Sequence, residues 1–392
     1  MYIIHLGFSG FPVGNAAIQR VRFTFKAVQQ AGFTPLIINK QSTHQKVAYK
    51  KNINRFDGLI FLDTSPILTK PPEFLKRNIN KVQGLLREIK LLYSRRKKIK
   101  AAILYTPGFV ELLYYRVLSG LLGFSLVIQY VEHRSSIADR DSFFTKINDR
   151  LFDRYCASFC DGVIAISEFL MAEIRKNKPQ LPMIKIPAIC DFRDFEIIEA
   201  AKLDYKYFLY CGTINYTPVI DFVLDFFEKV KDENLYSGKM MFIIGGNSPK
   251  NFAAIEEAFK KSRYSSDIIL YKNMPYNSII PLYKSADLLI IPLRNNVQDI
   301  ARFPHKVSEY TASRRPLISS NIGELKYYFR DKTSALLAAE YDVNLYVDAI
   351  RQMKVGNQSF DEIGLKGYEV GYNNFHYTSN VEGIKSFFNN LK

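Results

Sequence analysis

Apolar, β-rich runs alternate with helical patterns along the whole chain, and this alternation restricts the fold more than any other feature. Apolar runs separated by helices are typical of a parallel sheet covered by helices on both faces. Because the pattern restarts after residue 205, the sequence predicts two doubly wound α/β domains. Strands are expected at 1–7, 34–38, 57–62, 100–105, 125–130 and 162–166, then at 206–211, 239–245, 267–271, 287–291, 316–319 and 334–337.

The expected boundary between the two domains lies between residues 187 and 205. The stretch IPAICDFRDF in this region has neither helical nor strand periodicity. A chain of 392 residues is long enough to bury two full cores. We therefore expect an N-terminal domain at 1–190, a second domain at 200–370, and a C-terminal helix at 371–392 that packs back on the first domain.

The first residues of the chain read as a buried strand that runs into a glycine loop, without a basic leader or a cleavage site. This start predicts a protein that stays in the cytoplasm. Residues 110–131 are apolar and long enough to span a bilayer. Glu111, Arg116 and a turn at Gly123 favour instead a buried helix followed by a buried strand. Four cysteines are too few for a disulfide framework, and none has zinc-site spacing.

Positive charge is concentrated in the first half of the chain. Residues 1–196 carry 30 Lys and Arg against 16 Asp and Glu, which leaves most of the total charge of +16 on this half. Such asymmetry predicts an anionic partner, either a membrane, a phosphorylated substrate or nucleic acid. Nucleic acid ranks last, because no nucleic-acid-binding motif accompanies the charge.

Residues 87–100 hold seven of these cations against one acid, interleaved with apolar residues at helical spacing. This composition predicts a helix that lies on an anionic membrane surface, with Ile89, Leu91, Leu92 and Ile99 entering the interface. A solvated helix face is the alternative. If the helix does lie on a membrane, the protein is expected to be peripheral at the inner face of the cell membrane. The predicted membrane patch consists of Arg87, Lys90, Arg95, Arg96, Lys97, Lys98 and Lys100.

Two segments have the features of phosphate sites. After the first strand, Gly7, Gly10 and Gly14 precede a helix, and such loops let backbone amides approach a phosphate. Their spacing is not that of a dinucleotide fingerprint, and a tight turn is an equal alternative. At 301–316, Pro304 suits the first turn of a helix whose N-terminus attracts a diphosphate. Lys306 would add a cation there, and Glu309, one turn further, could accept two ribose hydroxyls; a surface ion pair is the alternative.

Residues 303–329, FPHKVSEYTASRRPLISSNIGELKYYF, resemble the donor-binding segment of the retaining GT-B enzymes of glycosyltransferase family 4. The family pattern there is Pro-x-Lys-x-x-Glu-Tyr-x-Ala, followed by Pro, a strand and Gly-Glu. The segments ADLLIIPLRNN, CDGVIAISEFL and FLYCGTINYTPVIDFVLDFF are similar to other parts of the family. The resemblance is specific in the second half of the chain and weaker in the first.

The resemblance implies a GT-B fold of two Rossmann-like, doubly wound parallel-sheet domains with an inter-domain cleft. It implies a hexosyltransferase that moves a sugar, with retention, from a UDP- or GDP-type nucleotide-diphosphate sugar to a saccharide or lipid-linked saccharide. Synthesis of cell-surface polysaccharide or glycolipid is the expected role. No cofactor and no metal are expected. No sequence motif identifies the sugar, the nucleotide base, the acceptor or the oligomeric state.

The resemblance also assigns residues, with His133, Lys306 and Glu309 as the expected catalytic group and Glu132 as the alternative to His133. Ala301 replaces a glutamate that the family often has, and residues 212–216 lack the family's Arg and Lys. An epimerase-like enzyme on the same fold and a non-catalytic partner subunit therefore stay open. Expected donor-binding residues are Gly14, Gly212, Thr213, Asn273, Met274, Arg294, Arg302, Phe303, Pro304, His305, Lys306 and Glu309. Expected acceptor-binding residues are Asn15, Gln19, Glu132, His133 and Arg134.

Overall fold

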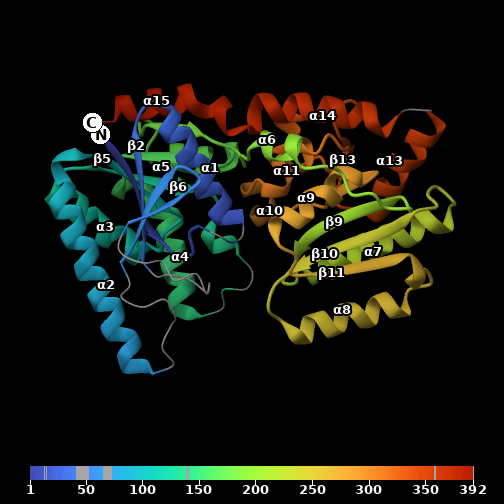
Figure 1. Ribbon diagram of the computed structural model, residues 1–392, viewed down its shortest axis with the longest axis horizontal. Coiled ribbons are helices and arrows are strands. Elements are labelled where there is room, and N and C mark those ends of the chain that lie inside the picture. The colour runs from blue at the N-terminus through green and yellow to red at the C-terminus, as the bar shows by residue number, and fades with distance from the viewer. Residues whose placement is uncertain are drawn as a thin grey trace. The chain divides into compact units, whose positions relative to one another are not determined.

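The structure is a computed structural model and describes residues 1–12, 14, 16–40, 53–64, 73–137, 140, 142–356 and 359–391. It consists of two compact units, residues 1–190 with 377–392, and residues 191–376. Both termini therefore lie in the first unit (Figure 1). The chain enters the second unit at Asp191, compared with the expected start at 200. It leaves that unit after His376, so the segment that returns to the first unit begins at 377, compared with the expected 371.

The first unit is built on a sheet in the order β3-β4-β2-β1-β5-β6-β7-β8. Its strands pair in parallel, except that β3 runs antiparallel to β4. Strands such as β6 and β7 are buried along their whole length, as the continuous apolar runs predicted. The strands are β1 Tyr2–Phe8, β2 Thr34–Asn39, β3 Asn54–Phe56, β4 Leu59–Asp63, β5 Ile99–Tyr105, β6 Ser125–Tyr130, β7 Gly162–Ala165 and β8 Met183–Lys185.

Helices cover this sheet, and the last of them, α15, packs on α1. The apolar stretch 110–131 forms α3 and β6, and Gly123 ends α3 in the left-handed conformation with φ of 74°. In the described part of the chain no helix has the length and apolar character that crossing a bilayer requires. The helices are α1 Ala16–Gln30, α2 Phe74–Arg95, α3 Phe109–Leu122, α4 Phe143–Tyr155, α5 Glu168–Asn177 and α15 Val381–Asn390.

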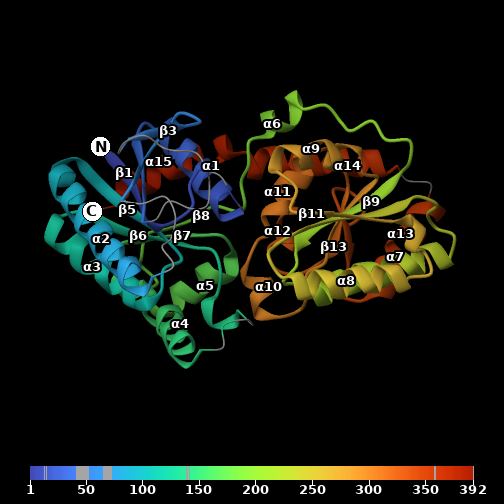
Figure 2. The same ribbon diagram turned by 60° about the horizontal axis from the view of Figure 1, so that its bottom comes forward.

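The second unit has a fully parallel sheet in the order β11-β10-β9-β12-β13-β14. Helices α7, α8 and α13 lie on one face of this sheet, and α9 and α11 lie on the other (Figure 2). Helix α14 packs on α11. The strands are β9 Tyr207–Thr213, β10 Lys239–Gly245, β11 Ile268–Lys272, β12 Leu288–Ile291, β13 Leu317–Ser320 and β14 Leu336–Ala338. The helices are α6 Phe192–Ile197, α7 Thr217–Asp232, α8 Pro249–Lys261, α9 Tyr276–Ser285, α10 Val297–Ala301, α11 His305–Ala312, α12 Leu325–Tyr328, α13 Val343–Val355 and α14 Phe360–Phe375.

The predicted fold class is confirmed, since both units are doubly wound parallel α/β sheets. The alternation of apolar runs did not reveal two short strands, β3 and β8, at the edges of the first sheet. Each has three residues that are exposed or half-buried, so neither leaves an apolar run in the sequence.

Candidate active site

The carboxyl ends of β9 and β12 form the most favourable ligand position in the second unit. Strand β9 is flanked by β10 on one side and β12 on the other, so the strand order reverses at this point. Ligands of open parallel sheets bind outside the carboxyl ends of the strands where the order reverses. The loop after β12 leads into α10 and then α11, which bring the conspicuous 301–316 segment to this edge of the sheet.

At the end of β9, Gly212 has no side chain, so the backbone itself faces this position. A Cβ added at Gly212 would lie 2.3 Å from the hydroxyl of Tyr210, so a larger residue would displace that ring. The backbone N–H of Cys211 donates a hydrogen bond to the hydroxyl of Tyr310 at 3.2 Å. Tyr310 belongs to α11, and this bond therefore ties the strand end to the helix. Gly212 and the partly buried Thr213 lie at the predicted donor-binding edge.

Lys306 and Glu309 form an ion pair within the first turns of α11, with 2.8 Å between Nζ of the lysine and Oε2 of the glutamate. Glu309 is 1% exposed, and its other oxygen lies 3.4 Å from Nε2 of His305. Burial acts to raise the pKa of Glu309, but the charges of Lys306 and His305 outweigh it and leave that pKa lowered. The carboxylate is therefore ionised at neutral pH and holds a lysine that keeps 27% of its side chain exposed.

A second charged cluster lies between β12 and α11. Asp299 is fully buried and accepts hydrogen bonds from Nε of Arg294 at 2.8 Å and from the backbone N–H of the same residue at 2.9 Å. Its other oxygen lies 2.7 Å from the guanidinium of Arg302. Arg302 also donates to the hydroxyl of Tyr216, which precedes α7, at 2.8 Å. One buried carboxylate thus holds two guanidinium groups that remain 25% and 19% exposed.

The remaining predicted donor residues are placed differently. Phe303 is 3% exposed, and its ring packs against Tyr328 and Phe375 in the core, so only its backbone is left to face a donor. Asn273, which follows β11, uses its side-chain amide in two hydrogen bonds to the backbone of Gly246. The structure leaves Met274 half-buried beside Asn273, and Pro304 at the N-cap of α11. Gly14 belongs to the first unit.

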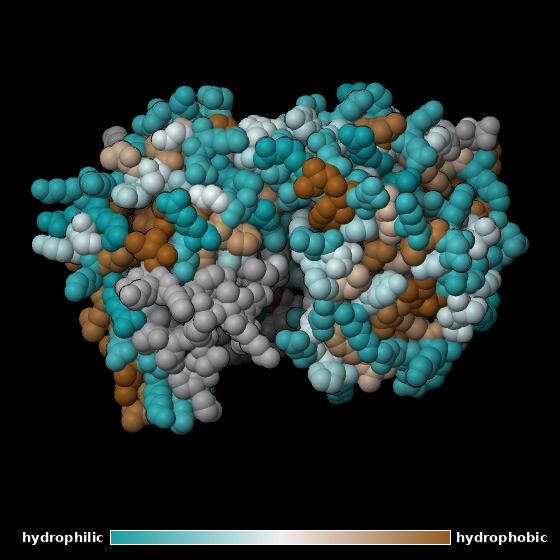
Figure 3. All heavy atoms as spheres, viewed as in Figure 1, coloured by the Kyte–Doolittle hydropathy of each residue, from teal (hydrophilic) through white to brown (hydrophobic). Residues whose placement is uncertain are grey.

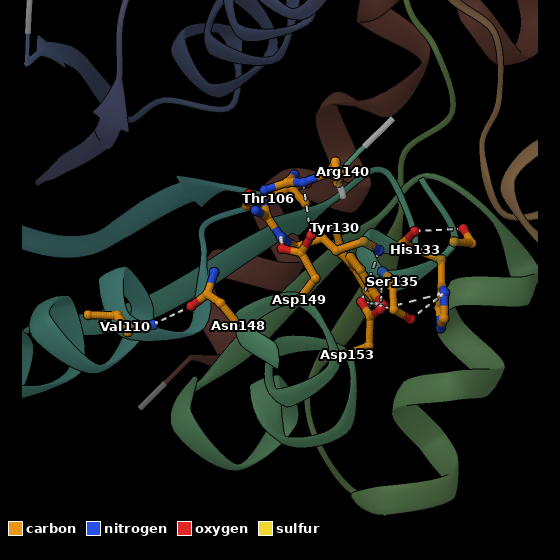
Figure 4. A network of polar contacts seen from close by, with 11 residues as sticks. Thr106, Val110, Tyr130, His133, Ser135, Arg140, Asn148, Asp149 and Asp153 are labelled. Atoms are coloured by element: carbon orange, nitrogen blue, oxygen red, sulfur yellow. Dashed lines mark hydrogen bonds and ion pairs between the residues drawn. The ribbon is translucent and has the colours of Figure 1, made fainter. Parts of the chain in front are cut away.

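In the first unit, His133 follows β6 and lies beside Asp153 of α4 (Figure 4). Its Nδ1 is 3.5 Å from Oδ2 of Asp153, and the imidazole is 19% exposed. Asp153 also accepts hydrogen bonds from the Tyr130 hydroxyl and from the backbone N–H groups of Arg134 and Ser135. This carboxylate therefore fixes the loop after β6 and orients the imidazole that it contains.

Arg134 was predicted to bind an acceptor, but in the structure its guanidinium is already bonded within the first unit. Its guanidinium donates to Asp149 at 2.8 Å and to the backbone carbonyl of Thr106 at 2.6 Å, and the side chain is 11% exposed. Gln19 is also unavailable, since it is 7% exposed and accepts a hydrogen bond from Arg22. Glu132 is half-buried next to His133. The prediction for Asn15 lies outside the described residues.

Sequence reasoning missed three carboxylates that organise these groups: Asp149, Asp153 and Asp299. Asp149 and Asp153 are four residues apart on α4, which places them on one helix face. The spacing of four residues in the sequence could have indicated a helix face with two carboxylates, which in the structure contact Arg134 and His133. Asp299 lies between two arginines in the sequence and three residues after Asn296, whose side chain caps α10. Among the described residues no three His, Cys, Asp or Glu side chains are grouped so that they could hold a metal ion.

Comparisons with known proteins bear on the fold and on the second unit. Residues 191–369 match the family model for glycosyl transferases group 1. The comparison with curated proteins gives no significant match. Sucrose-phosphate synthase from Thermosynechococcus elongatus is similar over 100% of this chain and 98% of its own, with 15% identity and a TM-score of 0.73. Anabaena HepE in complex with UDP-glucose is similar over 100% of both chains, with 12% identity and a TM-score of 0.71.

A third structure, a glycosyltransferase from Rickettsia africae, is similar over 99% of both chains, with 13% identity and a TM-score of 0.70. At such identities the structural matches show the fold, while the family model matches residues of the second unit. The chain thus has the two-domain GT-B fold, and its residues 191–369 match the family model for glycosyl transferases group 1.

Proposed function

We propose that the chain is a retaining glycosyltransferase that moves a hexose from a nucleotide-diphosphate sugar to a saccharide or lipid-linked saccharide. The observation that carries the proposal is the set of cations at the carboxyl edge of β9 and β12, within the group 1 domain. Arg294, Arg302 and Lys306 outnumber the two carboxylates that hold them. A surplus positive charge at this edge suits the diphosphate of a donor.

A UDP-type donor is supported by the solved relatives, because HepE structures contain UDP and UDP-glucose. As the glycosidic bond breaks, negative charge builds on the leaving diphosphate. Cations that are already in place stabilise that charge without reorganising, which lowers the barrier. The leaving phosphate can itself accept the proton of the attacking hydroxyl, so no protein base is needed. We propose His133, oriented by Asp153, as the group of the first unit that contacts the donor sugar.

The role in cell-surface polysaccharide or glycolipid synthesis, at the cytoplasmic face of a membrane, is part of the same proposal. It is supported by the excess of positive charge on residues 1–196. Titration of the protein with UDP and GDP, followed by an assay of donor hydrolysis and transfer, tests the enzymatic assignment. Product analysis by NMR gives the anomeric configuration, and an inverted product would refute retention.

A non-catalytic binding subunit is the second candidate, because Ala301 is fully buried where the resembling family often has a glutamate. This subunit would bind a nucleotide diphosphate but would not turn over a donor. Turnover of any nucleotide sugar above the buffer rate excludes it, whereas binding without turnover across a panel of donors favours it. An epimerase-like enzyme would release an isomerised sugar instead of a transferred one, and the same product analysis detects it.

Replacing Glu309 by alanine is expected to weaken binding of the correct nucleoside diphosphate by about 2–3 kcal/mol, since charge-assisted hydrogen bonds of this size are lost. Calorimetry with the nucleoside diphosphate and with inorganic diphosphate separates two roles. If Glu309 holds the ribose, only the affinity for the nucleoside diphosphate falls. Glu257→Ala, in an exposed ion pair on α8, is the matched control and should bind both normally. Equal affinity of wild type and Glu309→Ala would rule out the ribose assignment.

Activity is expected to survive chelation of divalent metal by EDTA, because the proposed site neutralises the diphosphate with side-chain cations. The sequence contains one Asp-x-Asp triplet, Asp139-Arg140-Asp141, whose two aspartates lie outside the described residues. The measurement is the initial rate with EDTA and after adding back magnesium or manganese. Loss of activity that the metal restores, and that Asp139→Asn or Asp141→Asn reproduces, would contradict the cation-based account.

A further inference from the structure

Helix α2 touches the rest of the first unit through a narrow face. Of its 22 residues, Gly84, Glu88 and Leu92 are the buried ones within this fully described helix. A Cβ added at Gly84 would lie 3.7 Å from the backbone carbonyl oxygen of Thr64, so the helix packs closely there. These three residues follow one another at intervals of four and form a single stripe along the helix.

A row of large apolar side chains occupies a different face of the same helix. At 100° per residue, the centre of this row lies about 140° around the axis from Glu88. Its spacings of four and three residues keep the row in one line over about 27 Å. We call it the apolar row; it consists of Leu75, Ile79, Val82, Leu86, Ile89 and Tyr93.

The apolar row is open to solvent. Leu75 is 70% exposed, Leu86 61%, and Val82 and Tyr93 56% each. In Figure 3, hydrophobic and hydrophilic atoms lie side by side along the edge where Figure 1 draws α2. Of the residues expected from sequence to enter a membrane, the half-buried Ile89 belongs to this row. Leu92 and Ile99 are 1% and 4% exposed, so they belong to the core and their assignment is wrong.

The charge around the row identifies its partner. Residues 74–98 carry nine Lys and Arg and a single acid, Glu88, which is buried. By helical spacing, Lys76, Arg87 and Lys90 lie along one side of the apolar row. Pairing of the row with α2 of a second copy would bring these like charges together, which opposes such a dimer. An anionic lipid surface would attract the same charges.

We propose that α2 is the membrane-attachment element of this protein, and that its apolar row enters the interface of an anionic bilayer while its cations contact the lipid headgroups. The helix would lie in the membrane plane, as amphipathic interfacial helices do. The inference deepens the proposed function, because a lipid-linked acceptor would be met at this surface. Its test uses neither donor nor acceptor, so the two can fail separately.

The chain contains no tryptophan, which makes a single introduced tryptophan a specific probe. Leu86→Trp in the full chain should show a blue-shifted emission when vesicles of phosphatidylcholine with phosphatidylglycerol are added at low salt. Brominated lipids should quench it. The matched control is Val355→Trp in the second unit, where the wild-type side chain is 83% exposed, and its emission should not change. No shift for Leu86→Trp, or an equal shift for both variants, would overturn the proposal.

Co-sedimentation with the same vesicles measures how much the apolar row contributes to membrane binding. Replacing Ile79, Val82 and Leu86 together by glutamine should lower the partition coefficient at least tenfold, because three apolar side chains no longer gain from burial. The control variant replaces Ile197, Val355 and Leu365, which are also exposed, and should bind as wild type does. A wild-type dimer in light scattering that the α2 variant dissociates would show that a second copy covers the row. Nucleotide affinity should be unchanged in both variants, which separates this result from a failure of the proposed function.

Discussion

Replacing Lys306 by alanine is expected to lower the turnover of the donor about a hundredfold, the usual loss when one group that stabilises developing charge is removed. The lysine lies in the first turn of α11, at the carboxyl edge of the sheet, and keeps 27% of its side chain exposed. Burial acts to lower the pKa of Lys306, but the neighbouring Cys211 and Glu309 side chains raise it by more, so the ammonium stays charged. The measurement is kcat at saturating donor.

The control for this substitution is Lys261→Ala. Lys261 forms an ion pair with Glu257 on α8, and both side chains are largely exposed. Exposed pairs contribute little, so kcat and stability should stay at the wild-type level. A wild-type kcat in Lys306→Ala would mean that the lysine only neutralises Glu309, and the electrostatic role would have to be abandoned.

The same variant has a pH signature that follows from linkage. The folded-state pKa of Glu309 is lowered, so its ionised form stabilises the protein above the ordinary pKa of 4.5, and that contribution is lost as pH falls through the folded value. Without Lys306 the buried carboxylate loses its nearest cation, and its pKa rises. Acid unfolding of Lys306→Ala should therefore begin at a higher pH than that of wild type, as circular dichroism can measure.

The fold could be predicted from sequence because every central strand is a continuous apolar run. Strands β6 and β10, expected at 125–130 and 239–245, have these bounds in the structure. The short edge strand β8 could not be predicted, because only half-buried residues form it. For α2, the sequence indicated an amphipathic helix but not which side faces the protein. The buried side is the one with Gly84, Glu88 and Leu92, and helical spacing alone does not distinguish it from the exposed sides.

Contacts of candidate-site residues could be predicted where the two partners are close in the sequence. They could not be predicted where the partner is distant in the sequence. Lys306 and Glu309 are three residues apart on one helix, and the structure forms the ion pair that the sequence offered as the alternative to a donor site, with Glu309 buried instead of at the surface. Arg134, by contrast, was expected from the family resemblance to bind an acceptor. Its partner, Asp149, lies 15 residues further along the chain, and nothing near Arg134 in the sequence shows that its charge is already neutralised.

Replacing Asp299 by asparagine is expected to destabilise the second unit by about 3 kcal/mol. Removing one member of a buried ionic cluster leaves the remaining charges without a counterion. Here two guanidinium groups would remain beside a neutral side chain, at 2.8 Å and 2.7 Å from its oxygens in the present arrangement. Each guanidinium keeps some contact with water, which holds the expected cost at the lower end for such clusters.

A loss of this size should lower the melting temperature of a domain of this length by about 6–12 °C, as calorimetry can measure. Asp361→Asn is the matched control, because Asp361 pairs with Arg315 at 2.7 Å but is 72% exposed, and its change should cost less than about 1 kcal/mol. Asp299→Asn should also weaken diphosphate binding, since Arg294 and Arg302 lose the carboxylate that holds them in one place. Asp299→Glu keeps the charge, and it should recover more diphosphate affinity than stability, because its longer side chain does not fit the buried position. A melting temperature and an affinity equal to wild type in Asp299→Asn would show that the two arginines are positioned by other contacts.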